Sequence, residues 1–129
     1  MKHRIIFSSL CILLPLLPQA QSVVSLKING TINPVTADYI YRGIEKAQSG
    51  RAECLLIELN TPGGLLKSTR VIVGNLLESS VPVVVFISPS GAQAGSAGVF
   101  IALSANIAAM APATNLGAAH PVPGGPQEP

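Results

Sequence analysis

Along most of the chain, apolar runs alternate with amphipathic segments. Residues 23–28, 54–59 and 82–88 are rich in Val, Ile and Leu, which is typical of strands. Between these runs, apolar side chains recur at helical spacing and predict helices over residues 34–49 and 65–79. The order strand, helix, strand, helix, strand favours an α/β fold with a parallel sheet. Because the strands lack polar alternation, we expect helices to cover both faces of that sheet.

Local signals refine these boundaries. Asn33 followed by Pro34 is typical of a helix N-cap with proline in the first turn. After the third strand, residues 91–98 form a small, Gly-rich segment. We expect a helix over residues 99–105 and a short fourth strand over residues 107–110.

The composition is that of one globular domain. The 129 residues are 48% hydrophobic and 11% charged, so the chain can bury a core. The net charge of +2 comes from Lys2 and Arg4, because acidic and basic residues balance from residue 23 onward. This balance excludes the basic surface that a nucleic-acid-binding protein needs.

Residues 1–22 have the organisation of a secretory signal peptide. A positive start at residues 2–4 precedes an apolar segment at 5–17 and small residues at 18–22. The apolar segment is shorter than the roughly 20 residues of a membrane span, so a retained membrane helix is the second interpretation. We therefore expect an exported mature domain over residues 23–119.

Residues 120–129 are rich in Pro and Gly and predict an irregular loop or tail. No segment with the pattern of a closing helix or strand follows the fourth predicted strand. We therefore expect the domain to be incomplete at its C-terminal end.

Two Gly-rich loops are the candidate sites of chemistry, because ligands of parallel α/β sheets bind beyond the carboxyl ends of the strands. The loop Thr61-Pro62-Gly63-Gly64 either presents bare backbone N–H groups to a ligand or is simply a tight turn. Residues 91–98 place Ser96 among side chains of almost no bulk, as a nucleophilic serine at a strand-to-helix turn requires. The alternative is that Ser96 only caps the helix that follows.

Three segments, taken in order, carry a resemblance to a known family. They are IELNTPGG at residues 57–64, GAQAGSAG at 91–98 and AMAPATNLGAAHP at 109–121. Together they resemble the Clp-peptidase and crotonase-like fold, and in particular its exported branch, the NfeD-like (nodulation-efficiency) membrane serine proteases. The resemblance implies that Ser96 is the nucleophile and that the backbone N–H groups of Gly64 and Ala97 form the oxyanion hole.

The same resemblance implies the surroundings of the enzyme. It implies a peptide or membrane-protein substrate, assembly into a homo-oligomer, and no cofactor or metal. It also implies attachment to the extracytoplasmic side of the membrane through segments outside this sequence.

The sequence departs from the family pattern at two places. Asn60 stands where the family usually has Asp, which keeps the turn chemistry and loses a charge. NfeD-like proteases also use a downstream Lys as general base, whereas Lys67 is the last lysine here and is expected on a solvated helix face. His120 is the remaining candidate base, unless it is an ordinary loop residue.

These observations leave three functions to compare. The first is a serine endopeptidase domain whose base lies outside this sequence. The second is a catalytically silent binding or assembly module of the same fold. The third is a crotonase-type acyl-CoA enzyme, which uses a similar pair of backbone amides, but an exported protein is unsuited to CoA chemistry.

Overall fold

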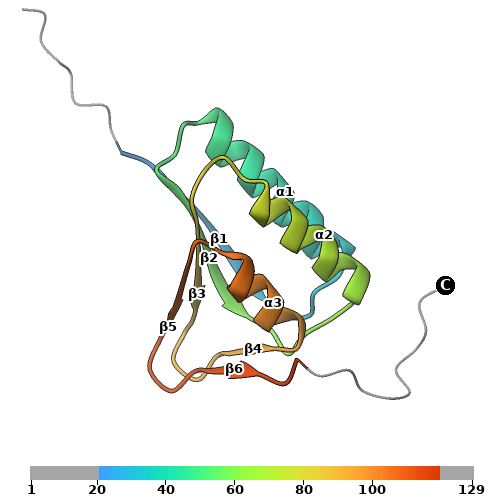
Figure 1. Ribbon diagram of the computed structural model, residues 1–129. Helices are drawn as coiled ribbons and strands as arrows, with labels where there is room; N and C mark the ends of the chain where they lie inside the picture. Colours follow the sequence, from blue (N-terminus) through green and yellow to red (C-terminus); the bar gives the residue numbers. More distant parts are fainter. Residues whose placement is uncertain (1–20, 120–129) are drawn as a thin grey trace, which may run out of the picture.

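The computed structural model describes residues 21–119 (Figure 1). Within that range, four parallel strands form one sheet in the order β1-β2-β3-β5, and β4 pairs with β6 in a second, two-stranded sheet. The strands are β1 (Val23–Asn29), β2 (Cys54–Asn60), β3 (Val83–Ile87), β4 (Gln93–Gly95), β5 (Ile107–Met110) and β6 (Asn115–Gly117). The helices are α1 (Pro34–Ser49), α2 (Leu66–Leu77) and α3 (Ala97–Ser104). The predicted α/β class with a parallel sheet is confirmed.

Helix α1 begins where the sequence predicts. The Asn33 side chain accepts a hydrogen bond from the Thr36 N–H at 3.0 Å, and Pro34 occupies the first turn. Its buried stripe includes Ile40 and Ala47, both fully enclosed, and the helix packs on β1 and β2. The cap and the apolar spacing therefore fix both the start of α1 and the face that it buries.

The observed elements differ from the predicted ones mainly between residues 91 and 117. Strands β4 and β6 were not predicted, because each has three residues and no hydrophobic alternation. The two strands pair in parallel with one another, although about twenty residues separate them in the sequence. Helix α3 begins two residues before its predicted range and follows β4 closely, whereas β5 occupies the predicted range.

The three helices of the described chain lie on one side of the main sheet (Figure 1). On that side, the central strands β2 and β3 carry fully buried side chains: Leu55, Ile57, Leu59, Val83 and Val85. On the opposite side, the alternate side chains of β2 and β3 are only half-buried. The sequence predicts helices on both faces of the sheet. Within residues 21–119, helices cover one face, and the other face is partly exposed.

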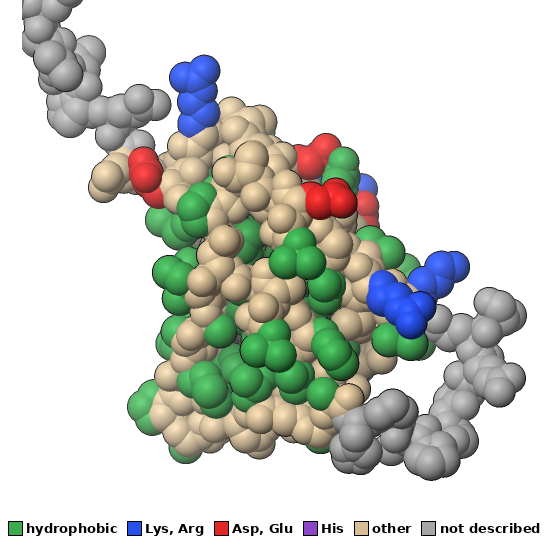
Figure 2. Space-filling model, viewed as in Figure 1, with side chains coloured by type: hydrophobic (Ala, Val, Ile, Leu, Met, Phe, Trp, Pro, Cys, Tyr) green, Lys and Arg blue, Asp and Glu red, His purple; other side chains and the backbone are tan. Residues whose placement is uncertain are grey.

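Charge is distributed unevenly over the molecule. The sequence from Ser79 to Ala119 has no charged side chain. In Figure 2, charged groups lie toward the top and right, while apolar side chains gather around α3 and the lower strands. Phe100 and Leu103 of α3 are 47% and 72% exposed, and Ile107 of β5 is 58% exposed. This end of the domain therefore offers an uncharged, largely apolar surface.

The predicted signal peptide, residues 1–22, lies outside the described residues except for Gln21 and Ser22. The predicted tail, residues 120–129, lies wholly outside them, and so does His120.

Candidate active site

Ser96 occupies the turn that joins β4 to α3. Its backbone has φ 47° and ψ −106°, a conformation that type II′ turns usually give to glycine. The Ser96 N–H donates to the Gly117 carbonyl of β6 at 3.0 Å, and the Ser96 carbonyl accepts from the Val99 N–H at 3.1 Å. The serine therefore sits on a sharp, strained strand-to-helix turn, the arrangement that exposes the nucleophile in serine hydrolases.

The alternative interpretation of Ser96 as a helix cap is not supported by its contacts. Ser96 stands at the N-cap position of α3, but its side chain makes no capping hydrogen bond. An N-cap serine normally accepts from an N–H two or three residues later. The hydroxyl of this half-buried residue is thus not used by the helix that it precedes.

The Gly63-Gly64 loop is held against the start of α1. The Ile32 N–H donates to the Gly63 carbonyl at 2.8 Å, and the Leu65 N–H donates to the Ile32 carbonyl at 2.9 Å. Gly64 lies between these two bonds, so a side chain there would collide with the Ile32 backbone. In such a parallel bridge the N–H of the central residue points away from its partner strand, here away from Ile32.

The two candidate loops meet directly. The Thr61 N–H donates to the Gln93 carbonyl at 2.7 Å, and the Gly95 N–H donates to the Thr61 carbonyl at 2.9 Å. Gly63 has φ +125°, and a Cβ placed on it would lie 2.8 Å from the Ser96 Cβ. Only a glycine permits this approach, so the small residues of both loops are explained by close packing as well as by backbone conformation.

Two backbone amides are available beside Ser96. Among residues 21–119, no hydrogen-bond acceptor is found for the N–H of Gly64 or of Ala97. Ala97 is the first residue of α3, so its N–H has no partner within the helix and lies at the positive end of the helix dipole. A developing negative charge on an oxygen near Ser96 would therefore find uncommitted donors.

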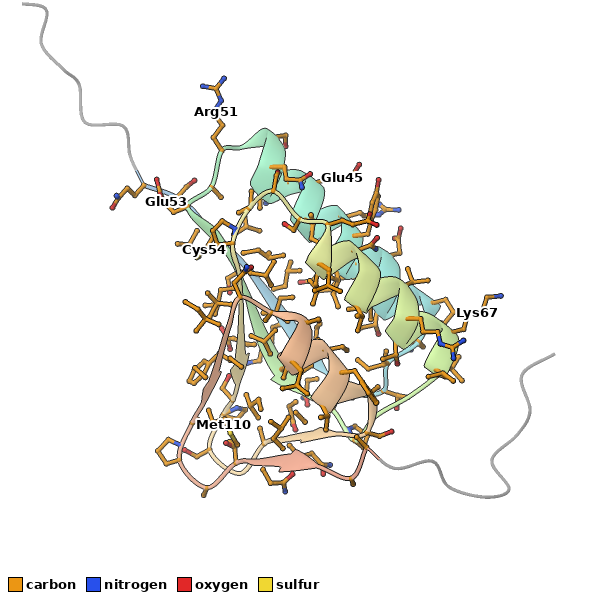
Figure 3. All side chains as sticks on the ribbon, in the orientation of Figure 1. Glu45, Arg51, Glu53, Cys54, Lys67 and Met110 are labelled. Carbon is orange, nitrogen blue, oxygen red and sulfur yellow. The ribbon has the colours of Figure 1, made fainter. Side chains whose placement is uncertain are left out.

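The described residues bring no base to Ser96. Lys67 lies in the first turn of α2, is exposed, and points outward into solvent (Figure 3). Glu58 lies on the opposite face of β2 from the buried Ile57 and Leu59. The loops that carry Gly64, Ser96 and Ala97 thus lie against one another, and the described chain adds no base to them.

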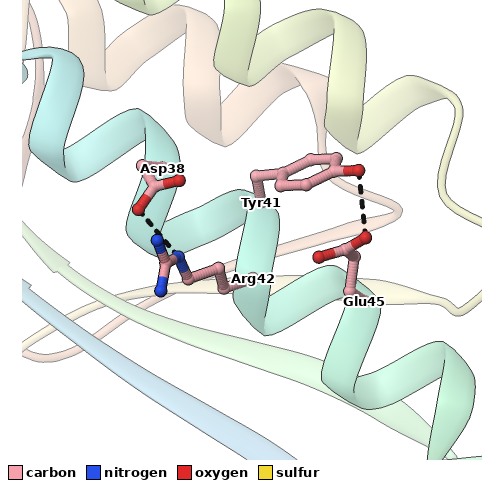
Figure 4. A network of polar contacts seen from close by, with 4 residues as sticks. All are labelled: Asp38, Tyr41, Arg42 and Glu45. Carbon is pink, nitrogen blue, oxygen red and sulfur yellow. Dashed lines mark hydrogen bonds and ion pairs between the residues drawn. The ribbon is translucent and has the colours of Figure 1, made fainter.

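The described ion pair and the hydrogen bond between Tyr41 and Glu45 lie on the outer surface of α1. Arg42 pairs with Asp38 at 2.8 Å, and the Tyr41 hydroxyl donates to the Glu45 carboxylate at 3.0 Å (Figure 4). The hydrogen bond to Glu45, reinforced by its negative charge, raises the pKa of Tyr41 above 10.0. These pairs are solvated side-chain contacts and do not orient a base.

Sequence reasoning missed Asn60 as a contact of the serine loop. Its side-chain oxygen accepts from the Gln93 N–H at 3.0 Å, and its amide nitrogen donates to the Asn29 side chain at 2.9 Å. The sequence does show an amide side chain directly before a Gly-rich loop. However, the residue that Asn60 contacts, Gln93, belongs to strand β4, which was not predicted.

Within residues 21–119, no helix is both long enough and apolar enough to cross a bilayer. No cluster of three or more His, Cys, Asp or Glu side chains in that range is arranged to hold a metal ion.

Two curated proteins are similar to this chain in sequence. The membrane-bound protease PH1510 of Pyrococcus horikoshii is 42% identical over 98 residues, which make up 76% of this chain and 22% of that protein. The membrane protein NfeD1b of Bacillus subtilis is 32% identical over 106 residues, or 82% of this chain and 24% of that protein. The chain thus spans less than a quarter of the length of either relative.

Solved structures agree with this similarity. A serine-to-alanine mutant of the 1510-N membrane-bound stomatin-specific protease has a TM-score of 0.80 and 38% identity, covering 86% of this chain and 54% of that one. A lysine-to-alanine mutant of the same protease, in complex with a substrate peptide, has a TM-score of 0.79 and 40% identity, covering 83% and 49%. ClpP1 from Listeria monocytogenes, at 23% identity, a TM-score of 0.57 and coverage of 63% and 46%, shares the fold.

The family comparison covers most of the chain. Residues 22–126 match the family described as NfeD1b, N-terminal domain. The match includes both candidate loops and all described strands and helices. The relatives are membrane proteins, and the solved ones are protease domains with a ClpP-like fold. The chain therefore belongs to the NfeD1b N-terminal domain family.

Proposed function

We propose that this chain is the nucleophile-bearing part of a membrane-associated serine endopeptidase domain. In this proposal Ser96 attacks a peptide carbonyl, and the N–H groups of Gly64 and Ala97 bind the oxyanion. The observation that carries it is the strained Ser96 turn packed against Gly63, with two uncommitted amides beside it. The solved relative named as a protease with a serine-to-alanine mutant supports the same assignment.

The reaction follows from the atoms at this turn. As the Ser96 Oγ bonds to the carbonyl carbon, its proton passes to a base and negative charge moves onto the carbonyl oxygen. The amides of Gly64 and Ala97 stabilise that charge, at a magnitude of about 2.7–4 kcal/mol for one such donor. The C–N bond then breaks, the amine leaves with a proton, and water hydrolyses the ester on Ser96.

We propose that the base is a lysine in the part of the domain that lies beyond this sequence. Lys67 is the last lysine of the sequence and points into solvent (Figure 3). A solved relative, of which this chain covers 49%, is a lysine-to-alanine mutant in complex with a substrate peptide, which supports a lysine at the site of that protease. Such a lysine must be desolvated, because its free pKa of about 10.4 would leave it protonated at neutral pH.

The test compares two proteins in a peptide hydrolysis assay. One is the 129-residue chain, and the other is the same chain extended with the C-terminal half of the 1510-N domain. We expect the extended chain to cleave peptide, and the short chain to be slower by about 10²–10⁴-fold because it lacks a general base. Ser96→Ala in the extended chain should abolish cleavage. Efficient cleavage by the short chain, lost on His120→Ala, would instead identify His120 as the base.

A silent module of the same fold is the second candidate, favoured by the lack of a base near Ser96 in residues 21–119. A fluorophosphonate probe distinguishes the two, because it labels only an activated serine. Labelling of Ser96 in the extended chain supports the enzyme. No labelling at high protein concentration supports a binding or assembly role, for which a homo-oligomer is the expected form.

We also propose an extracytoplasmic location, with the signal cleaved so that the mature protein begins between Gln21 and Val23. The charged start and the apolar segment at residues 5–17 support it, as do relatives named as membrane proteins. N-terminal sequencing of protein from an exporting host tests this proposal, and an intact Met1 would contradict it.

A further inference from the structure

Asn60 joins three segments at the carboxyl end of β2. Its Oδ1 accepts from the backbone N–H of Gln93, the first residue of β4, at 3.0 Å. Its Nδ2 donates to Asn29 Oδ1, at the end of β1, at 2.9 Å. Because a backbone N–H can only donate, the Asn60 oxygen must face Gln93, and the orientation of the amide is fixed.

This contact is the first of a short series that leads to the serine. The Thr61 N–H bonds to the Gln93 carbonyl, and the Gly95 N–H bonds to the Thr61 carbonyl. Ser96 follows Gly95 directly. Strand β4 has only three residues, so the Asn60 side chain supplies the bond that fixes the start of the strand on this side.

We infer that Asn60 is a positioning residue that sets the Ser96 turn against the Gly64 amide, with Asn29 holding its side chain in place. This inference rests on the proposed function and deepens it. Gln93 is exposed, so water can replace the lost acceptor and the fold survives without it. Without the Asn60 contact, Ser96 is displaced while the fold is kept. A displacement of about 1 Å at a reacting group costs on the order of 10²-fold in rate.

The variants are chosen by shape and hydrogen-bonding capacity. Asn60→Leu keeps the approximate volume and removes the acceptor, whereas Asn60→Asp keeps the acceptor for the Gln93 N–H. The matched control is Asn106→Leu, because the Asn106 Oδ1 also accepts a backbone N–H at the start of a strand, that of Val83, at 2.8 Å. Val83 begins β3, at the opposite end of the main sheet from the carboxyl ends where the two loops meet.

The first measurement is amide hydrogen exchange in the 129-residue chain. It does not depend on catalysis. With Asn60→Leu, we expect exchange at Gly95 and Ser96 to accelerate at least tenfold more than in α1, whose amides report global opening. Asn106→Leu should show no such local difference. Equal acceleration of all amides, or none at Gly95 and Ser96, would overturn the inference.

The second measurement is fluorophosphonate labelling and peptide hydrolysis in the extended chain. Asn60→Leu should slow labelling and lower kcat by about 10–100-fold with little change in KM, and Asn60→Asp should recover most of the rate. An unchanged kcat in a folded Asn60→Leu protein would overturn the positioning role. If the parent chain is not labelled at all, the proposed function fails, and the exchange measurement alone decides whether Asn60 holds the turn.

Discussion

Replacing Ser96 by glycine should make the domain more stable than replacing it by alanine. Both changes remove the hydroxyl, and both keep the backbone bonds to Gly117 and from Val99. Alanine keeps the Cβ at φ 47° and ψ −106°, whereas glycine adopts this conformation without strain. The two variants therefore differ by the strain stored in the turn.

The magnitude follows from two opposing terms. A non-glycine residue held in a sparsely populated region costs about 1–3 kcal/mol, and glycine costs roughly 0.5–1 kcal/mol through the entropy of the unfolded chain. The net gain for glycine is about 1 kcal/mol. For a domain of this size, that corresponds to a Tm higher by roughly 4–8 °C.

Urea unfolding and calorimetry of Ser96→Gly and Ser96→Ala measure the difference directly. Ala105→Gly is the control, because Ala105 caps the other end of α3 with an ordinary extended backbone, φ −77° and ψ 155°. It should lose about 0.5–1 kcal/mol through the entropy of glycine, plus the packing of its partly buried methyl group against the core, and so must not gain stability. If Ser96→Gly unfolds at or below the temperature of Ser96→Ala, the turn stores no strain and the reasoning is refuted.

Three further predictions concern Gly63, Gly74 and Glu45. Gly63→Ala should lower the free energy of unfolding by about 2 kcal/mol or more, because its φ of +125° and its approach to the Ser96 Cβ both exclude a side chain. Gly74→Ala, inside α2 with open space around it, should instead raise stability by about 0.8–1 kcal/mol in the same urea titration. Glu45→Gln should lower the pKa of Tyr41, because the charged acceptor that retains the phenol proton is lost. An NMR titration of the Tyr41 ring gives this shift, and an unchanged midpoint would contradict the assigned cause.

The sequence predicts those parts of the fold that depend on residues close to one another along the chain. The Asn33-Pro34 cap and the apolar runs of β2 and β3 carry their own signals, because a cap and a buried strand need no distant partner to be recognised. Strand β5 was predicted for the same reason, since its range follows directly from its apolar composition.

Strands β4 and β6 could not be predicted in this way. Each is defined by hydrogen bonds to residues far away in sequence, and Gln93–Gly95 has no periodic pattern of its own. The same reason hid the role of Asn60, whose partner Gln93 begins β4. The position of Ser96 near the Gly63-Gly64 loop was expected because loops that follow the carboxyl ends of strands gather at one edge of a parallel sheet.

The convergence of distant segments at Ser96 also determines when the serine turn can exist during folding. Its supports are bonds between Ile32 and Gly63, between Thr61 and Gln93, and between Ser96 and Gly117, and each pair lies far apart in sequence. Such contacts form only after the intervening chain has been closed into loops, so the turn is assembled late. A nascent chain carries the same serine in an ordinary segment, without the Gly63-Gly64 loop packed against it. Any cleavage by this domain therefore begins only when folding is complete.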